Sequence, residues 1–227
     1  MKEIRRVPVT REASKATYDR ISKYYDLVGL FENRYKALAL EMADFREGER
    51  VLEVGCGTGW ALERIACQVG ESGKACGLDL SPKMLEVARD RLQKAGLMRR
   101  VELVEGDATK MRFPDEMFDA AFSTFTLELF DTPDIPVVLS EIRRVLKPGG
   151  RFVDLSISRE TVGIVTRAYE WIHDRFPRYI DCRPIYAERS LREAGFKITS
   201  TKRISILDLC GEIVCGLKEK EKRVSHR

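Results

Sequence analysis

The stretch Val51-Leu52-Glu53-Val54-Gly55-Cys56-Gly57-Thr58-Gly59 decides the fold of this chain. A short, mostly apolar run enters a turn that contains three glycines, and a helical pattern follows over residues 60–69. Glycines permit a sharp turn and let a ligand approach the main chain, while the free N–H groups at a helix start attract a carboxylate or a phosphate. We therefore expect a buried strand that leads into a ligand-binding turn.

Outward from this turn, short β-branched runs alternate with helical patterns. The expected strands cover residues 50–54, 75–80, 101–105, 120–123 and 151–156, with helices at residues 60–69, 82–95 and 136–145 between them. This alternation is typical of a parallel sheet that is covered by helices on both faces, so we predict a doubly wound α/β fold. Ser81 followed by Pro82 predicts a helix start, and Lys147-Pro148-Gly149-Gly150 predicts a turn into the next strand.

The flanking segments complete the prediction. Two helices are expected within residues 13–43, and a helix at residues 161–175 is followed by a short helix at 187–194 and two strands near 197–204 and 212–217. At 227 residues, one domain can bury most of its apolar surface around a single core.

No run of the sequence reaches the roughly 18 apolar residues of a membrane span, and charges occupy the amino end where a signal peptide is apolar. We expect a soluble, cytoplasmic protein.

The net charge of +4 comes from the two ends of the chain. Basic residues gather in residues 1–15 and 217–227, while the body between them is slightly acidic, so no nucleic-acid partner is expected. The basic ends are solubilising tails, or they contact an anionic membrane, where each well-placed Lys or Arg would contribute about 1 kcal/mol of binding free energy.

The six cysteines form no C-x-x-C pair, and only His173 and His226 could complete a metal-ligand set with them. We therefore expect buried thiols and no metal site.

Two aspartates follow the second and third expected strands. Asp79 lies 20 residues after Gly59, where its carboxylate either accepts hydrogen bonds from ribose hydroxyls or caps the next helix. Asp107 either binds an adenine amino group or begins a turn. Because the carboxyl ends of parallel strands meet at one edge, these features converge on one crevice. Gly59 comes one position too early for G-x-G-x-x-G, which argues against an NAD-binding dehydrogenase.

These motifs resemble the class I S-adenosylmethionine-dependent methyltransferases, most closely the ubiquinone and menaquinone biosynthesis C-methyltransferases. The resemblance covers about residues 17–217 and includes Gly77-Leu78-Asp79-Leu80-Ser81-Pro82, Glu105-Gly106-Asp107-Ala108 and Leu146-Lys147-Pro148-Gly149-Gly150. It implies a Rossmann-like fold with a seven-stranded, mostly parallel sheet whose last hairpin is partly antiparallel. It also implies a single domain over residues 1–227, with a helical lid (1–45), a cofactor-binding core (46–217), a substrate-lining insertion (about 157–190) and a charged tail (218–227).

The resemblance assigns cofactor contacts residue by residue. It places three glycines and Thr58 beside the methionine part, Glu53 at its ammonium, Asp79 at the ribose, Leu80 and Ala108 around the adenine, Asp107 at the adenine amino group and Thr124 near the transferable methyl. In the lid, Tyr18 and Tyr25 share a helical face and close over the cofactor, or simply pack on the core. The implied contacts are Tyr18, Tyr25, Glu53, Gly55, Gly57, Thr58, Gly59, Asp79, Leu80, Asp107, Ala108 and Thr124.

The catalytic base is unknown from the sequence. Where the family often has a histidine, this chain has Leu127-Glu128-Leu129, so the candidates are Tyr25, Glu128 and His173, with Asp131 as a further replacement. Glu128 and Asp131 are otherwise interpreted as surface loop carboxylates. Tyr169 and His173 share a helix face that either lines the acceptor pocket or packs. Arg183 either pairs with an anionic group of the acceptor or makes a structural salt bridge.

Methyl transfer from a sulfonium needs alignment and desolvation more than a protein nucleophile. We therefore predict an S-adenosylmethionine-dependent methyltransferase that releases S-adenosylhomocysteine and acts on a small-molecule or lipid-like acceptor, with quinone-type C-methylation favoured by the resemblance. The alternatives are a phospholipid or amine N-methyltransferase, an arsenite methyltransferase that uses Cys182, Cys210 and Cys215, and a non-catalytic nucleotide-binding module. The oligomeric state is not predicted.

Overall fold

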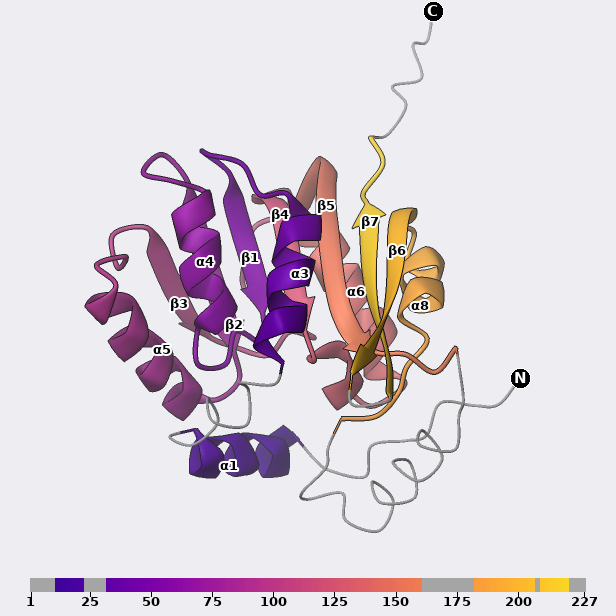
Figure 1. The fold of residues 1–227 in the computed structure, drawn as a ribbon, viewed down its shortest axis with the longest axis horizontal. Coiled ribbons are helices and arrows are strands. Elements are labelled where there is room, and N and C mark those ends of the chain that lie inside the picture. Colours follow the sequence, from indigo (N-terminus) through magenta and orange to yellow (C-terminus); the bar gives the residue numbers. More distant parts are fainter. Residues whose placement is uncertain (1–10, 23–31, 161–181, 207–208, 221–227) are drawn as a thin grey trace, which may run out of the picture.

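A seven-stranded sheet runs through the middle of the molecule (Figure 1). The computed structural model describes residues 11–22, 32–160, 182–206 and 209–220. The strand order is β3-β2-β1-β4-β5-β7-β6, and every pairing from β3 to β5 is parallel. The strands are β1 Arg50–Val54, β2 Lys74–Asp79, β3 Val101–Glu105, β4 Phe118–Thr124, β5 Leu146–Ile157, β6 Lys197–Ile206 and β7 Leu209–Leu217.

The structure confirms the predicted doubly wound, mostly parallel sheet. β7 pairs antiparallel with both β5 and β6, as expected for the last hairpin. One boundary differs, because β5 begins directly after the preceding helix and includes the Lys147-Pro148-Gly149-Gly150 stretch. The register between β4 and β5 shifts between Phe118 and Ala120, and this irregularity accommodates the proline and the two glycines at the strand start.

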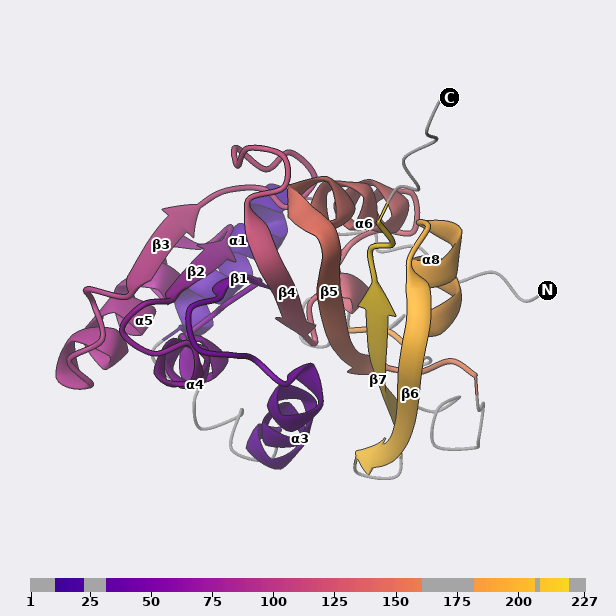
Figure 2. The same cartoon turned by 90° about the horizontal axis from the view of Figure 1, so that it is seen from above.

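Helices cover the two faces of the sheet, as Figure 2 shows from above. Helices α3 Asn33–Ala43, α4 Trp60–Gln68 and α5 Pro82–Lys94 pack on one face, and α6 Asp134–Val145 and α8 Ala187–Glu193 pack on the other. Each helix buries the apolar stripe that its 3.6-residue period predicts. In α6 this stripe consists of Ile135, Val138, Leu139, Ile142 and Val145.

Helix α1 Arg11–Ile21 crosses the end of the molecule where β1 and β2 finish (Figure 1). Ser81 Oγ donates a 2.6 Å hydrogen bond to Asp19 Oδ1, and Lys15 Nζ lies 2.7 Å from Glu105 Oε1. These contacts hold α1 against the start of α5 and the end of β3. The predicted helix at residues 161–175 lies outside the described residues.

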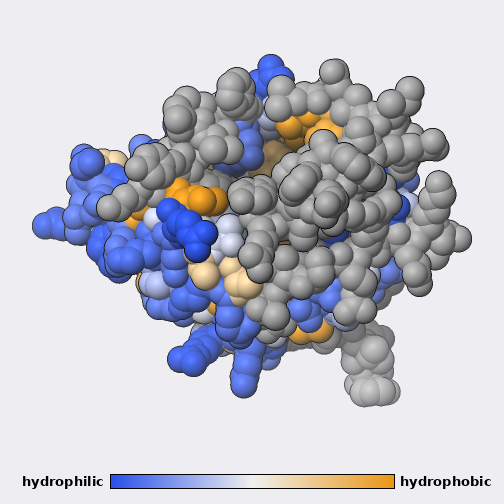
Figure 3. Space-filling model, turned by 90° about the horizontal axis from the view of Figure 1, so that it is seen from below, coloured by the Kyte–Doolittle hydropathy of each residue, from blue (hydrophilic) through white to orange (hydrophobic). Residues whose placement is uncertain are grey.

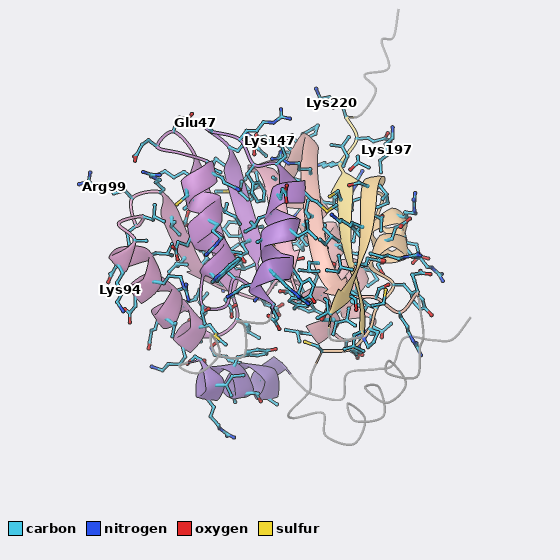
Figure 4. The ribbon with its side chains drawn as sticks, in the orientation of Figure 1. Glu47, Lys94, Arg99, Lys147, Lys197 and Lys220 are labelled. Atoms are coloured by element: carbon cyan, nitrogen blue, oxygen red, sulfur yellow. The ribbon has the colours of Figure 1, made fainter. Side chains whose placement is uncertain are left out.

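The opposite end of the sheet is strongly charged. Figure 4 shows Glu47, Lys147 and Lys220 at this end, away from α1.

In the described part of the chain, no helix combines the length and apolar character that crossing a bilayer requires.

Removing the side chain of Phe122 tests how much its burial contributes to the stability of the fold. Phe122 is fully buried in β4, and its ring meets that of Phe45 edge to face at 5.8 Å. Phe122→Ala leaves a cavity, so we expect the free energy of unfolding to fall by about 3–5 kcal/mol in chemical denaturation. The control is Val137→Ala on the exposed side of α6, for which a change within about 0.5 kcal/mol is expected. Equal effects of the two variants would contradict this packing.

Candidate functional site

A cavity opens at the carboxyl ends of β1, β2 and β4, between the sheet and helices α1 and α3. Viewed from this side, apolar surface appears between hydrophilic side chains (Figure 3). The wall combines backbone from the glycine turn with apolar and acidic side chains. Its residues include Tyr18, Glu53, Gly55, Gly57, Thr58, Asp79, Leu80, Asp107, Ala108, Thr124, Phe125, Phe130 and Asp131.

The three glycines of the turn serve different purposes. All have positive φ, and a β-carbon on Gly55 would lie 2.5 Å from Thr126. A β-carbon on Gly57 would meet no described atom within 4 Å and would project into open space. Gly59 does not line the cavity, because it begins α4 and packs against Ala88 of α5, where a β-carbon would lie 3.0 Å away. The geometry thus separates Gly59 from the two glycines that face the cavity.

Asp79 ties the glycine turn to the start of α5. Its Oδ2 accepts a 2.8 Å hydrogen bond from Gly57 N, and its Oδ1 accepts a 2.9 Å bond from Ser81 N. Ser81 is the cap of α5, since its Oγ accepts from Met84 N, so the alternative interpretation of Asp79 as the helix cap is wrong. Desolvation raises the pKa of Asp79, and the hydrogen bonds from backbone N–H groups oppose that shift.

Glu53 is the most deeply buried acid of the cavity wall. It is 2% exposed, and its Oε2 has no hydrogen-bond partner among the described residues. Desolvation raises the pKa of Glu53 well above its usual range, while the nearby Lys36 ammonium opposes the shift. An orphaned buried acceptor in a cavity wall suits a cationic or hydrogen-bond-donating ligand group. Lys36 lines the same cavity from α3, and no signal in the sequence predicts this position.

The residues that the sequence predicts around the adenine also line the cavity. Leu80 and Ala108 both line it. Asp107 Oδ1 accepts 2.8 Å hydrogen bonds from the N–H and the hydroxyl of Thr109, so Asp107 does begin a turn. Asp107 follows β3 and lines the cavity, and an adenine contact stays a prediction.

The end of β4 presents a strained backbone to the cavity. Phe125 follows Thr124 with φ +51°, which is unfavourable for a bulky side chain. Its N–H donates to Leu155 O at 2.7 Å, and Thr126 Oγ1 donates to Thr124 O at 3.0 Å. These bonds hold the strained turn so that Thr124, Phe125 and Thr126 all line the cavity.

Glu128 is not a surface loop carboxylate, and that interpretation is wrong. The 3-10 turn Leu127–Leu129 folds it inward, so it is 0% exposed and its Oε2 accepts a 3.0 Å hydrogen bond from Ile157 N. Desolvation, with the nearby Asp154 carboxyl group second, raises its pKa well above the usual range. Glu128 does not line the cavity, whereas the partly buried Asp131 does.

Arg183 is also buried, at 2% exposure. Its Nη2 donates a 2.5 Å hydrogen bond to Phe130 O, and Thr132 Oγ1 lies 3.4 Å away. These contacts fix the segment before α8 against the cavity wall. The other predicted acceptor or base residues, Tyr25, Tyr169 and His173, lie outside the described residues.

Three cysteines would have to converge for arsenite chemistry. Cys182, Cys210 and Cys215 are free thiols. No group of three or more His, Cys, Asp or Glu residues with metal-binding geometry occurs in residues 11–22, 32–160, 182–206 and 209–220. The arsenite alternative stays a prediction that this geometry does not test.

Comparison with known proteins identifies the family. Residues 51–150 match the model of a methyltransferase domain. The ubiquinone/menaquinone biosynthesis C-methyltransferase UbiE of Pseudomonas fluorescens (strain Pf0-1) is 34% identical over 171 residues, which are 72% of this chain and 66% of that protein. The chain belongs to the class I S-adenosylmethionine-dependent methyltransferases. This methyltransferase thus aligns with just under two thirds of the length of the UbiE protein.

Solved structures with this fold include a SAM-dependent methyltransferase from Aquifex aeolicus, with 24% identity, a TM-score of 0.60 and coverage of 81% of this chain and 89% of that one. The [4+2]-cyclase SpnF has 23% identity and a TM-score of 0.68, covering 82% and 81% of the two chains. At these identities the likeness concerns the fold alone. Because a cyclase also has this fold, the fold does not set the reaction.

The cavity of this methyltransferase fits the cofactor that its family implies. The orphaned Glu53 Oε2 can accept from an ammonium, and the open space at Gly57 admits a ligand close to the main chain. Asp79 stands at the end of β2, where a carboxylate meets ribose hydroxyls in folds of this kind.

Gly57 and Gly59 offer a matched pair of substitutions. Both adopt positive φ, so alanine at either position costs about 1 kcal/mol or more in backbone strain. Gly59→Ala also presses on α5, and we expect a loss of about 2–3 kcal/mol in the free energy of unfolding. Gly57→Ala should destabilise less but weaken S-adenosylhomocysteine binding at least tenfold, because its methyl enters the cavity. Calorimetry measures the binding of S-adenosylhomocysteine, and chemical denaturation measures the free energy of unfolding. Weaker binding in Gly59→Ala than in Gly57→Ala would contradict the conclusion that Gly57 faces the ligand and Gly59 packs on α5.

Asp154 makes the stability of the fold depend on pH. It is fully buried in β5, and Ser123 Oγ donates a 2.5 Å hydrogen bond to its Oδ1. Desolvation is the largest cause that raises the pKa of Asp154 to about 7. Because the folded state retains the proton, its stability falls as the pH rises from about 4 to about 7 and then levels off.

Asp154→Asn removes this titration. We expect the free energy of unfolding of the wild type, relative to the variant, to fall by about 3–4 kcal/mol between pH 4 and pH 7. Urea denaturation across this range measures the difference, and Asp90→Asn on the surface of α5 controls for loss of a charge. A difference that is constant with pH would contradict the shifted titration.

Proposed function

We propose that this protein transfers the methyl group of S-adenosylmethionine to a ring carbon of a quinol-type acceptor in the cytoplasm. The cavity, with its glycine turn, the buried Glu53 carboxyl group and Asp79, carries the cofactor part of the proposal. The choice of acceptor is supported by the 34% identity to a ubiquinone/menaquinone biosynthesis C-methyltransferase.

In this proposal each wall residue holds one part of the cofactor. Gly55, Gly57 and Thr58 lie along the methionine part, and Glu53 accepts from its ammonium. A second group binds the nucleoside and orients the methyl, with Asp79 at the ribose hydroxyls. This group consists of Asp79, Leu80, Asp107, Ala108 and Thr124. Tyr18 closes the cavity from α1, which Asp19 and Lys15 fasten in place.

The bound cofactor supplies an electrophilic methyl on a sulfonium, and the chain supplies alignment and a dry site. Phe125, Leu129 and Phe130 form an apolar part of the wall that excludes water from the acceptor side. A phenol or an aromatic carbon also needs a proton acceptor. Asp131 lines the cavity and is better placed for this role than Glu128, which lies behind the wall.

The remaining sequence assignments stay proposals. They are the single-domain organisation with its helical lid and substrate-lining insertion, the roles of Tyr25, Tyr169 and His173, and an anionic-membrane contact through the basic ends. An acceptor contact by Arg183 is not favoured, because its guanidinium binds the Phe130 carbonyl.

An amine acceptor is the second candidate, and the charge of the cavity favours it. Acidic side chains outnumber basic ones in the described wall, where Asp131 and Asp134 join Glu53, Asp79 and Asp107 against Lys15 and Lys36. An excess of carboxylates attracts a cationic ligand. The amine that these side chains attract is protonated, so it must lose a proton, for which Asp131 is available in the wall, before its lone pair attacks the methyl.

Product analysis with S-adenosylmethionine and panels of quinols, phospholipids and amines tests the proposal. We expect mass spectrometry to detect a C-methylated quinol. Asp79→Asn should lower kcat/KM about tenfold to a hundredfold, because losing a hydrogen bond to a charged group costs about 1.5–3 kcal/mol. Asp90→Asn serves as the matched control. Methylation of amines but of no quinol would replace the first candidate with the second, and no S-adenosylmethionine binding would contradict both.

A further inference from the structure

Glu128 is a fully buried acid that has no part in the proposed reaction. It is 0% exposed and lies in the 3-10 turn Leu127–Leu129. Thr126 before this turn and Leu129 at its end line the cavity, but Glu128 does not. Withdrawing a carboxyl group from water costs free energy unless hydrogen bonds satisfy it, so its place behind the wall requires an explanation.

Glu128 bonds to the sheet where the pairing of β4 and β5 ends. The last pair is Thr124 with Leu155, and Phe125 then leaves the strand with positive φ. Phe125 N still donates to Leu155 O at 2.7 Å. Two residues further along β5, Ile157 N donates to Glu128 Oε2 at 3.0 Å. The side chain therefore accepts the hydrogen bond that β4 no longer accepts, and it ties the turn to the end of β5.

This turn carries the acceptor side of the cavity wall. Leu129, Phe130 and Asp131 follow Glu128 directly, and all three line the cavity. Further along, Arg183 Nη2 donates a 2.5 Å hydrogen bond to Phe130 O. The wall is thus held between two side-chain contacts, one to the end of β5 and one to the segment before α8. Losing the first contact would release the end of the wall that is nearest to β4.

The surroundings of Glu128 oppose its ionisation. Desolvation is the largest cause that raises its pKa well above the usual range, and the Asp154 carboxyl group of β5 is the next. The hydrogen bond from Ile157 N opposes this shift. In a turn that had opened to water, Glu128 would ionise near its ordinary pKa of 4.5. The closed turn therefore loses stability, relative to an open one, as the pH rises from about 4.5 towards the raised pKa.

The other neighbouring elements add one more acid to these surroundings. Glu32, before α3, also raises the pKa of Glu128, while the Cys182 side chain, before α8, lowers it. The cations on these elements bind other groups, since Lys36 pairs with Glu32 and Arg183 binds a backbone carbonyl. Burial and the neighbouring carboxyl groups thus dominate the titration of Glu128.

We propose that Glu128 is a positioning residue for the methyl acceptor: by binding Ile157 N, it holds residues 129–131 in place as the wall that the acceptor contacts. The inference rests on the proposed function, because the acceptor must lie against this wall. It gives Glu128 no direct role in proton transfer, since its carboxyl group does not line the cavity. Binding of the acceptor should therefore weaken with rising pH, while binding of the cofactor should not change.

Amide hydrogen exchange tests the positioning role without an acceptor. Glu128→Gln keeps an oxygen for Ile157 N but cannot ionise, whereas Glu128→Leu has no hydrogen-bond acceptor. Mass spectrometry compares peptides from residues 125–133 with reference peptides from α6. We expect Glu128→Leu to lower the protection of residues 125–133 at least tenfold. Between pH 5 and pH 8 the wild type should lose about tenfold or more of the protection that Glu128→Gln retains, because one proton released on opening changes the equilibrium by up to tenfold per pH unit.

Steady-state kinetics connect the wall to the acceptor. With a short-chain quinol as the probe and saturating S-adenosylmethionine, Glu128→Leu should raise the KM for the quinol at least tenfold and change kcat less. The KM of the wild type should rise between pH 6 and pH 8, whereas that of Glu128→Gln should stay constant. Calorimetry should find S-adenosylhomocysteine affinity within twofold of the wild type in both variants. Glu86→Gln and Glu86→Leu, on the exposed side of α5, are the matched controls.

The contrary outcomes separate this inference from the proposed function. The positioning role is overturned if Glu128→Leu keeps the protection of residues 125–133, or if α6 loses protection equally, which would indicate general destabilisation. It is also overturned if Glu128→Gln shares the pH dependence of the wild type, or if it abolishes kcat with its protection intact, which would make Glu128 a proton acceptor. The expected exchange results without methylation of any quinol would overturn the proposed acceptor and still support the positioning of the wall by Glu128.

Discussion

The bridge that Asp79 makes between two backbone N–H groups is the contact on which the site depends. Gly57 N and Ser81 N belong to the turns that follow β1 and β2, and one carboxylate accepts from both. Without it, the glycine turn and the start of α5 would each leave a donor unsatisfied at the cavity wall. Because the same aspartate faces the cavity, the group that stabilises these turns also stands ready for ligand hydroxyls.

The local parts of this arrangement were predictable from the sequence. The apolar run into Gly55, Gly57 and Gly59 and the Ser81–Pro82 helix start depend on residues close in the chain, and the structure confirms the sheet that they imply. What depends on distant packing was not predictable. Glu128 is buried where its carboxyl group accepts a hydrogen bond from Ile157 N, 29 residues away in the sequence. Gly59 contacts Ala88 because of the way α4 packs against α5.

For Lys36 the sequence predicts the local contact but not what the side chain faces in the folded protein. Glu32 and Lys36 are four residues apart, a spacing that predicts an ion pair on a helix. Whether the pair faces solvent or a ligand depends on the orientation of α3 over the sheet. Several carboxylates in the same region are likewise kept out of water, among them Glu53, Glu128 and Asp154. Burying such groups costs stability, and binding sites are where proteins commonly accept that cost.

A crystal structure of the protein with S-adenosylhomocysteine would test the central claim most directly. The account predicts the ribose hydroxyls within hydrogen-bond distance of Asp79, with its bond to Gly57 N retained, and the amino-acid end against Glu53 Oε2. A ligand that binds in the cavity without touching Asp79, or that binds elsewhere on the molecule, would contradict it.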